Sequence, residues 1–134
     1  MIDEHLNEVA ESINDLKRKY NIGLDLRRGD DYIYVAFNAN KYKRVVDRDL
    51  DWTDIIEYGN GIKVVVDEKG SIVIKKVDEK GETELERLDV SKNGMAIFSS
   101  YEYRPFAPSN KAIYTITYVD NRGEEEEHEE EEYL

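Results

Sequence analysis

The first twenty residues carry apolar side chains at helical spacing. The apolar positions are 4, 3, 4, 3 and 4 residues apart, with charged residues between them: Ile2, Leu6, Val9, Ile13, Leu16 and Tyr20. Such spacing turns one side of a helix toward a core and leaves the other side in solvent. The pattern predicts a helix over about residues 3–20. The stripe is as narrow as a coiled-coil seam, so a homodimer through this helix is an alternative to packing on a sheet.

After the helix the hydrophobic period falls to two. Residues 22–26 alternate apolar and polar, 28–31 read as a turn, and 32–37 (YIYVAF) are typical of a strand, which together predict a hairpin. Further strands, separated by short turn sequences, are predicted at 62–67, 71–77, 83–90, 95–103 and 112–119. Short turns between successive strands predict an antiparallel meander.

The segment between the hairpin and the later strands follows neither period clearly. Residues 38–50 are polar and predict an irregular loop. Asp51 is suited to cap a short helix over residues 52–58, which Gly59 would end. The predicted fold class is therefore α+β: a long N-terminal helix packed on an antiparallel, meander-like curled sheet, with one short second helix.

The chain ends in a block of like charge. Residues 124–134 read EEEEHEEEEYL, which repels itself and has almost nothing to bury. We expect one α+β domain over residues 1–123 followed by a disordered acidic tail over 124–134, since 134 residues suit a single domain.

The net charge hides an uneven distribution. Of the net −12, the tail contributes eight negative charges, so residues 1–123 carry 19 basic and 23 acidic side chains, or −4. Residues 17–48 hold nine Lys or Arg against four Asp, a local +5. Phosphate binding depends on the local potential rather than on the total charge, so an acidic chain can still present a basic face.

Several kinds of chemistry lack the residues that they need. There is no cysteine, and the two histidines, His5 and His128, lie in the predicted helix and in the tail, so the body offers no Ser/His/Asp set apart from His5. No glycine-rich phosphate loop is present. The spacing of Asp47, Asp49 and Asp51 is the best carboxylate metal candidate, but it is more typical of a solvated loop. We therefore expect a protein that is not an enzyme and has no cofactor.

The chain lacks the features of membrane and secreted proteins. No stretch approaches the ~20 apolar residues of a membrane span, and the acidic N-terminus is unlike a signal peptide. We expect an intracellular protein without a membrane partner.

Tyrosine is the positive signal. Six of the ten tyrosines lie in predicted strands at even spacing, which puts each pair on one face of its strand: Tyr32, Tyr34, Tyr101, Tyr103, Tyr114 and Tyr118. Basic residues flank these strands: Arg27, Arg28, Lys41, Lys43, Arg44, Arg104 and Lys111. Bases stack on aromatic rings at about 1–3 kcal/mol each while cations follow the phosphates. Together with Tyr42 and Phe106, these residues form a predicted site for single-stranded DNA. The alternative is that the tyrosines only stabilise the sheet through cross-strand pairs.

The tail carries a resemblance to known proteins. Glu124–Leu134 resembles the acidic, hydrophobic-ended tails of single-stranded-DNA-binding proteins of bacteria and phages. That resemblance implies a tail that competes with DNA for the groove and recruits replication or recombination proteins, through Glu129, Glu130, Glu131, Glu132, Tyr133 and Leu134. In size and layout the chain is similar to the small single-stranded-DNA-binding proteins of rod-shaped archaeal viruses, which lack the OB-fold. This similarity implies a viral replication protein in the host cytoplasm.

The expected function is therefore non-enzymatic binding of single-stranded DNA by a face of Tyr and Lys/Arg. One alternative is an acidic regulator or inhibitor that mimics nucleic acid and docks on a nucleic-acid-handling protein. Another is a structural or assembly protein whose helix forms a dimer seam.

Overall fold

The computed structural model describes residues 4–29, 32–90, 95–103 and 112–120, the last two ranges through their backbone. The predicted helix is confirmed as α1 (Glu4–Tyr20), with basic residues in its last turn that suit the negative end of the helix dipole. After the last helical residue, Tyr20, the backbone of Asn21 is left-handed with a φ of 53°, and the amide of Ile22 donates to the carbonyl of Lys17 at 3.3 Å.

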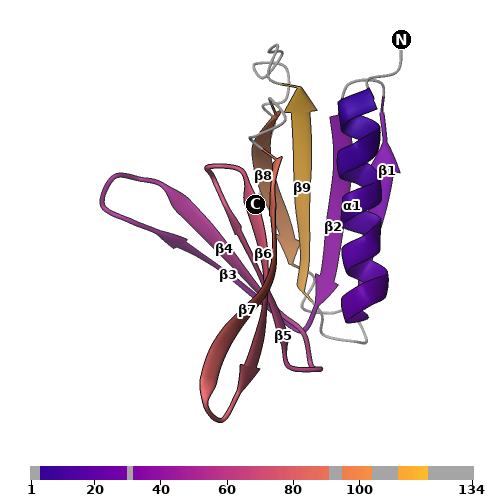
Figure 1. The fold of residues 1–134 in the computed structure, drawn as a ribbon. Coiled ribbons are helices and arrows are strands. Elements are labelled where there is room, and N and C mark those ends of the chain that lie inside the picture. The colour runs from indigo at the N-terminus through magenta and orange to yellow at the C-terminus, as the bar shows by residue number, and fades with distance from the viewer. Residues whose placement is uncertain (1–3, 30–31, 91–94, 104–111, 121–134) are drawn as a thin grey trace.

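The rest of the described chain consists mostly of strands: β1 (Leu24–Arg28), β2 (Tyr32–Ala39), β3 (Lys41–Val46), β4 (Trp52–Glu57), β5 (Ile62–Asp67), β6 (Ser71–Asp78), β7 (Gly81–Asp89), β8 (Met95–Tyr103) and β9 (Ala112–Asp120). They form two antiparallel sheets (Figure 1). The first sheet has the order β1-β2-β9-β8 and the second has the order β3-β4-β5-β6-β7. The chain is α+β in the broad sense.

The prediction of one meander-like curled sheet under a long helix is wrong. Strands β3 to β7 do follow one another as a meander, but β9 returns to lie between β2 and β8 in a separate sheet. The pairing of Tyr32 with Val119 joins two strands that are far apart in the sequence. Turn residues specify neighbouring hairpins and carry no information on such long-range pairings.

The predicted short second helix is also wrong. Residues 52–57 form β4, which pairs with β3 on one side and β5 on the other. The predicted irregular segment over 38–50 contains β3. Pairing with two neighbouring strands, together with the alternating burial of Asp54 and Ile56, outweighs the helix-end signals of Asp51 and Gly59.

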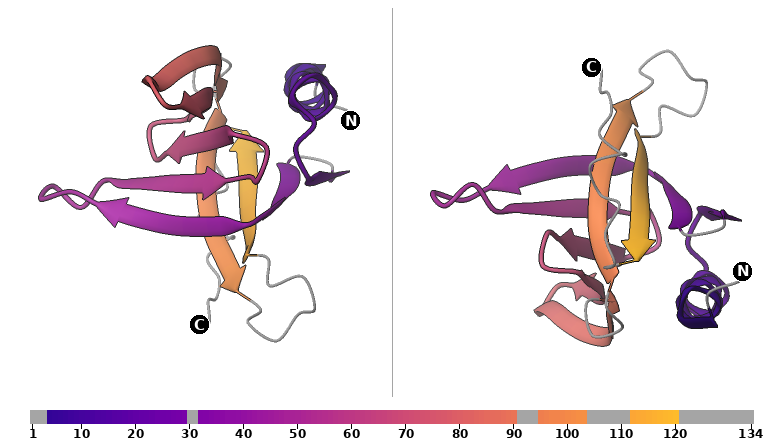
Figure 2. Two further views of the ribbon diagram at one scale, coloured as in Figure 1. Left: turned by 90° about the horizontal axis from the view of Figure 1, so that it is seen from below. Right: turned by 90° about the horizontal axis from the view of Figure 1, so that it is seen from above.

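The chain passes from the first sheet to the second at Asn40. Phe37 and Ala39 are buried in β2, whereas Tyr42 and Arg44 are the inward positions in β3, so the alternation shifts by one residue. The amide of Asn40 donates to the carbonyl of Glu57 at 3.0 Å. This change of sheet lets the strands of the two sheets cross steeply (Figure 2).

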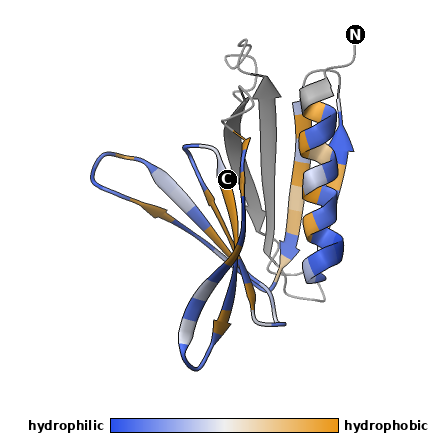
Figure 3. Cartoon of the chain, in the orientation of Figure 1, coloured by the Kyte–Doolittle hydropathy of each residue, from blue (hydrophilic) through white to orange (hydrophobic). Residues whose placement is uncertain are grey.

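One core is shared by the helix and both sheets. The helix stripe packs with alternate residues of β2 and of the second sheet, all buried: Leu6, Val9, Ile13, Leu16, Ile33, Val35, Phe37, Ile56, Val64, Val66, Ile72 and Ile74. The helix turns its hydrophobic side toward β2 and its polar side away (Figure 3). The apolar stripe that could have served as a dimer seam is thus occupied within the chain. No helix in the described ranges is long and apolar enough to cross a bilayer.

Candidate nucleic-acid interface

The outer face of the first sheet is built by the alternation of β1 and β2. Ile33, Val35 and Phe37 are buried, so Tyr32 and Tyr34 lie on the opposite face. The register pairs Arg27 of β1 with Tyr34 of β2. Because directly paired residues share a face of an antiparallel sheet, a cation and a ring stand side by side on the outside of the molecule.

These residues surround a hollow of about 330 Å³ lined by Arg27, Arg28, Tyr32 and Tyr34. The hairpin that forms it is closed by the amide of Gly29, which donates to the carbonyl of Tyr32 at 2.9 Å. A Cβ at Gly29 would overlap the ring of Tyr32, so the ring lies directly on the glycine. The ring of Tyr32 can occupy this position only because residue 29 has no side chain.

Arg27 and Arg28 differ in their engagement. Arg28 points toward the helix, where its Nε donates to Oδ1 of Asn7 at 3.0 Å and its guanidinium also donates to the carbonyl of Gly29. Arg28 thus ties β1 to α1 while it lines the hollow. Arg27 is exposed and has no ion-pair partner among the described residues.

The KYKR segment divides between two faces of β3. Lys41 and Lys43 are exposed on the outer face of the second sheet and, within the described ranges, neither forms an ion pair. Tyr42 and Arg44 point the other way and bind Asp54, which is fully buried. Lys41 and Lys43 are therefore accessible to a ligand, whereas Tyr42 and Arg44 bind the buried Asp54.

Tyr42 and Arg44 hold Asp54 through three hydrogen bonds. It accepts from the hydroxyl of Tyr42 at 3.0 Å and from Nε and Nη2 of Arg44 at 2.7 and 2.8 Å. The Arg44 guanidinium also lies over the ring of Trp52, 4.5 Å from its centre. Burial acts to lower the pKa of Arg44, but hydrogen bonding to Asp54 and its charge outweigh burial and leave the pKa raised.

The tyrosines of β8 and β9 are positioned by register. Tyr118 pairs with Ile33 and Tyr114 with Phe37, and Tyr101 pairs in turn with Tyr114. These positions belong to the face of the first sheet on which Ile33 and Phe37 are buried, and Tyr103, paired with Ala112 beside Ala39, belongs to the same face. The register does not bring these four tyrosines together with Tyr32 and Tyr34.

The remaining predicted residues lie outside the described ranges. These are Arg104, Phe106 and Lys111 of the predicted DNA site, and the tail residues Glu129, Glu130, Glu131, Glu132, Tyr133 and Leu134.

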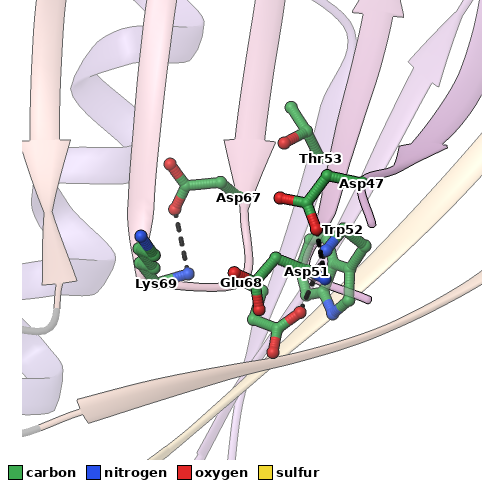
Figure 4. Close-up of a pocket in the computed structure, with 7 residues that line it drawn as sticks. All are labelled: Asp47, Asp51, Trp52, Thr53, Asp67, Glu68 and Lys69. Carbon is green, nitrogen blue, oxygen red and sulfur yellow. Dashed lines mark hydrogen bonds between the residues drawn. The ribbon is translucent and has the colours of Figure 1, made fainter. Parts of the chain in front are cut away.

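A second hollow, of about 140 Å³, lies at the ends of β4 and β5 (Figure 4). Its carboxylates accept hydrogen bonds from backbone amides: Asp47 from Asp49 and Asp51 at 2.8 and 3.0 Å, and Glu68 from Trp52 at 3.0 Å. Of the three aspartates that the sequence suggested as a metal candidate, Asp47 thus caps a turn, and Asp49 and Asp51 donate their backbone amides to it. Across the described ranges, no group of three or more His, Cys, Asp or Glu side chains is placed to hold a metal ion.

Comparison of the chain with protein-family models, curated proteins and solved structures gives no match. On the outer face of the first sheet, two tyrosines and an exposed arginine surround an open hollow. Rings and a cation in this arrangement can stack on a planar base and neutralise a phosphate, as in proteins that bind single-stranded nucleic acid.

Proposed function

We propose that this protein binds single-stranded DNA without catalysing a reaction, and that it does so on the outer face of the first sheet. The observation that carries the proposal is the pairing of Arg27 with Tyr34 on that face, beside Tyr32 and around a hollow of about 330 Å³. A nucleotide seated there would stack its base on a tyrosine and place its phosphate near the guanidinium.

Stacking supplies more of the expected affinity than charge does. Each stacked base contributes about 1–3 kcal/mol with little preference for sequence. Among the described residues, the exposed cation beside the hollow is Arg27, whereas Lys41 and Lys43 lie on β3 of the second sheet, away from the proposed site. Ring stacking requires an unpaired base, so this balance favours single strands over duplexes.

In this proposal the acidic tail has the role that its resemblance implies. Its carboxylates and its terminal Tyr133 and Leu134 recruit replication or recombination proteins, and they compete with DNA for the site. The protein then acts inside the cell, in the host cytoplasm if the chain is viral.

The test is a fluorescence-anisotropy titration of a labelled oligothymidine and of a duplex of equal length. Tyr34→Leu and Arg27→Gln are expected to weaken single-strand binding, whereas Arg18→Gln, at an exposed position of α1, leaves it unchanged. A version ending at Gly123 is expected to bind more tightly because a competing anion is removed. Absence of single-strand binding by both the full chain and the shortened chain would refute the proposal.

The second hollow favours a different candidate. Four carboxylates, Asp47, Asp51, Asp67 and Glu68, line this hollow with one cation, Lys69, so its net charge is negative. This surface suits a basic protein partner, as expected of an acidic regulator that mimics nucleic acid. Recovery of one stoichiometric basic partner, without any DNA binding, would support this candidate over the first.

A further inference from the structure

The outer face of the first sheet contains a row of four residues that crosses all its strands. Arg27 of β1 pairs with Tyr34 of β2, Tyr34 pairs with Thr117 of β9, and Thr117 pairs with Phe98 of β8. The sequence pattern gives no reason to single out Phe98, because its relation to Tyr34 depends on two pairings, one of them long-range. The register places it on the face of Tyr34, opposite to the face of the buried Val35 and Ile33.

We infer that Phe98 is a second base-stacking position and that single-stranded DNA crosses the sheet along the row from Arg27 to Phe98. This inference rests on the proposed function and gives it a direction. The row holds an aromatic residue on β2 and another on β8, with the smaller Thr117 between them.

The neighbouring row on the side of Lys41 supports this path. Next to the row, Ala36 pairs with Thr115, and Thr115 with Ser100, so the adjacent outer positions carry small side chains. A strand that followed β2 toward Lys41 would instead pass Ala36 and Asn38, which offer no ring. It would also pass Asp25, which pairs with Ala36 on β1 and would repel the phosphates.

The spacing along the row selects for an unstacked strand. Neighbouring strands lie about 4.8 Å apart, so residues two strands apart, such as Tyr34 and Phe98, are separated by about 9.6 Å. Stacked bases in a duplex are about 3.4 Å apart along each strand. Successive bases can reach both aromatic positions only when they are separated from each other. A single strand can do this readily and a duplex cannot.

The test compares Phe98→Leu, Phe98→Tyr and the double variant Lys41→Gln/Lys43→Gln in the full chain, with labelled oligothymidine. Loss of one stacked base predicts that Phe98→Leu weakens binding roughly 5- to 150-fold, while Phe98→Tyr stays within about 2-fold. The double lysine variant is expected to bind as the unchanged protein does. Arg27 is the described cation on the row, so the logarithm of the association constant should fall with the logarithm of the salt concentration at a slope of about −0.7. A path that also includes both lysines would have three cations and a slope of about −2.

The possible outcomes separate the inference from the proposed function. Loss of affinity in Tyr34→Leu but not in Phe98→Leu would overturn the row and leave the proposed function standing. Absence of binding by the unchanged protein would overturn both. If Phe98→Leu does not fold, photocrosslinking of bromodeoxyuridine oligonucleotides to the unchanged protein decides the question. A crosslink in residues 95–103 supports the row, and a crosslink confined to residues 41–46 overturns it.

Discussion

Arg44 and Asp54 form a two-point ion pair inside the protein, with Nε 2.7 Å from Oδ1 and Nη2 2.8 Å from Oδ2. The carboxylate is fully buried, while the side chain of Arg44 remains 27% exposed. The pair joins β3 to β4 at matched register positions, and Tyr42 contributes a further hydrogen bond. Tyr42 and Arg44, which the sequence predicts as DNA-binding residues, therefore anchor β3, the edge strand of the second sheet.

Replacement of Arg44 by methionine should destabilise the protein by about 3–5 kcal/mol, because the fully buried carboxylate loses its ionic partner. Urea denaturation followed by the emission of Trp52, whose ring lies against the guanidinium, measures the change. Lys43→Met is the matched control, since Lys43 is exposed on the other face of the same strand and should shift stability by less than about 0.5 kcal/mol. Equal effects of the two variants would show that the ion pair has no special role in stability.

The elements that sequence alone predicts well are those with local determinants. The stripe from Leu6 to Leu16 defines α1 to within one residue, and alternation with short turns defines β5 to β9 closely. β3 is missed because its exposed lysines and inward Arg44 make an edge strand look like a polar loop. β4 is misread because Asp51 and Gly59 suit the two ends of a short helix, while the partner that makes Asp54 a buried strand residue is ten positions away.

The candidate site likewise has one part that local sequence predicts and another that depends on distant contacts. Arg27, Tyr32 and Tyr34 lie in one hairpin, so their proximity can be inferred from the turn and the alternation. Alternation also places Tyr114 and Tyr118 on one face of a strand, but only the pairing with Phe37 and Ile33 identifies that face as the one toward the core. Such information resides in contacts between distant parts of the chain and not in any window of sequence.

Two glycines should respond differently to alanine. At Gly29 the added methyl group meets the ring of Tyr32, the far end of a flexible side chain, so the ring moves and the fold tolerates the change. At Gly23 the methyl would lie 2.7 Å from the backbone oxygen of Asn38, which cannot move without disturbing the sheet. We expect Gly23→Ala to cost about 1–3 kcal/mol of stability. Gly29→Ala should leave stability nearly unchanged and weaken binding of oligothymidine.

Thermal unfolding and anisotropy on the same two variants check this prediction. A strongly destabilised Gly29→Ala would mean that the ring of Tyr32 is fixed by the fold. Unchanged DNA binding by a stable Gly29→Ala would count against Tyr32 as a ligand contact.

Glu86 should make the attachment of the helix to β7 sensitive to acid. It accepts hydrogen bonds from the hydroxyl of Tyr20 at 2.8 Å and from Nζ of Lys19 at 3.1 Å, and these donors lower its pKa below the ordinary value. A carboxylate with a lowered pKa in the folded state stabilises the fold fully above its unfolded pKa of about 4.3. That contribution is lost as pH falls through the lowered value.

The measurement is the free energy of unfolding of the unchanged protein and of Glu86→Gln between pH 7 and pH 3. The unchanged protein should be the more stable at pH 7, by less than about 1 kcal/mol because the pair is partly exposed, and the difference should shrink on acidification. Tyr20→Phe removes the leading donor and should reduce the pH dependence. A difference that stays constant with pH would exclude ionisation of Glu86 as its source.

Leu50 adopts a left-handed backbone conformation, which is unfavourable for leucine. Its φ is 69°, its amide donates to the carbonyl of Asp47 at 2.9 Å, and its side chain is 78% exposed, so no burial offsets the left-handed geometry. Asparagine visits this region far more readily than leucine, and Leu50→Asn should therefore stabilise the protein by about 0.5–1 kcal/mol. Leu50→Ala is the control, since alanine removes the exposed side chain but keeps the unfavourable Cβ. Urea denaturation of the two variants separates the causes: equal gains would assign the effect to exposure of the leucine, and a gain for asparagine alone assigns it to the backbone.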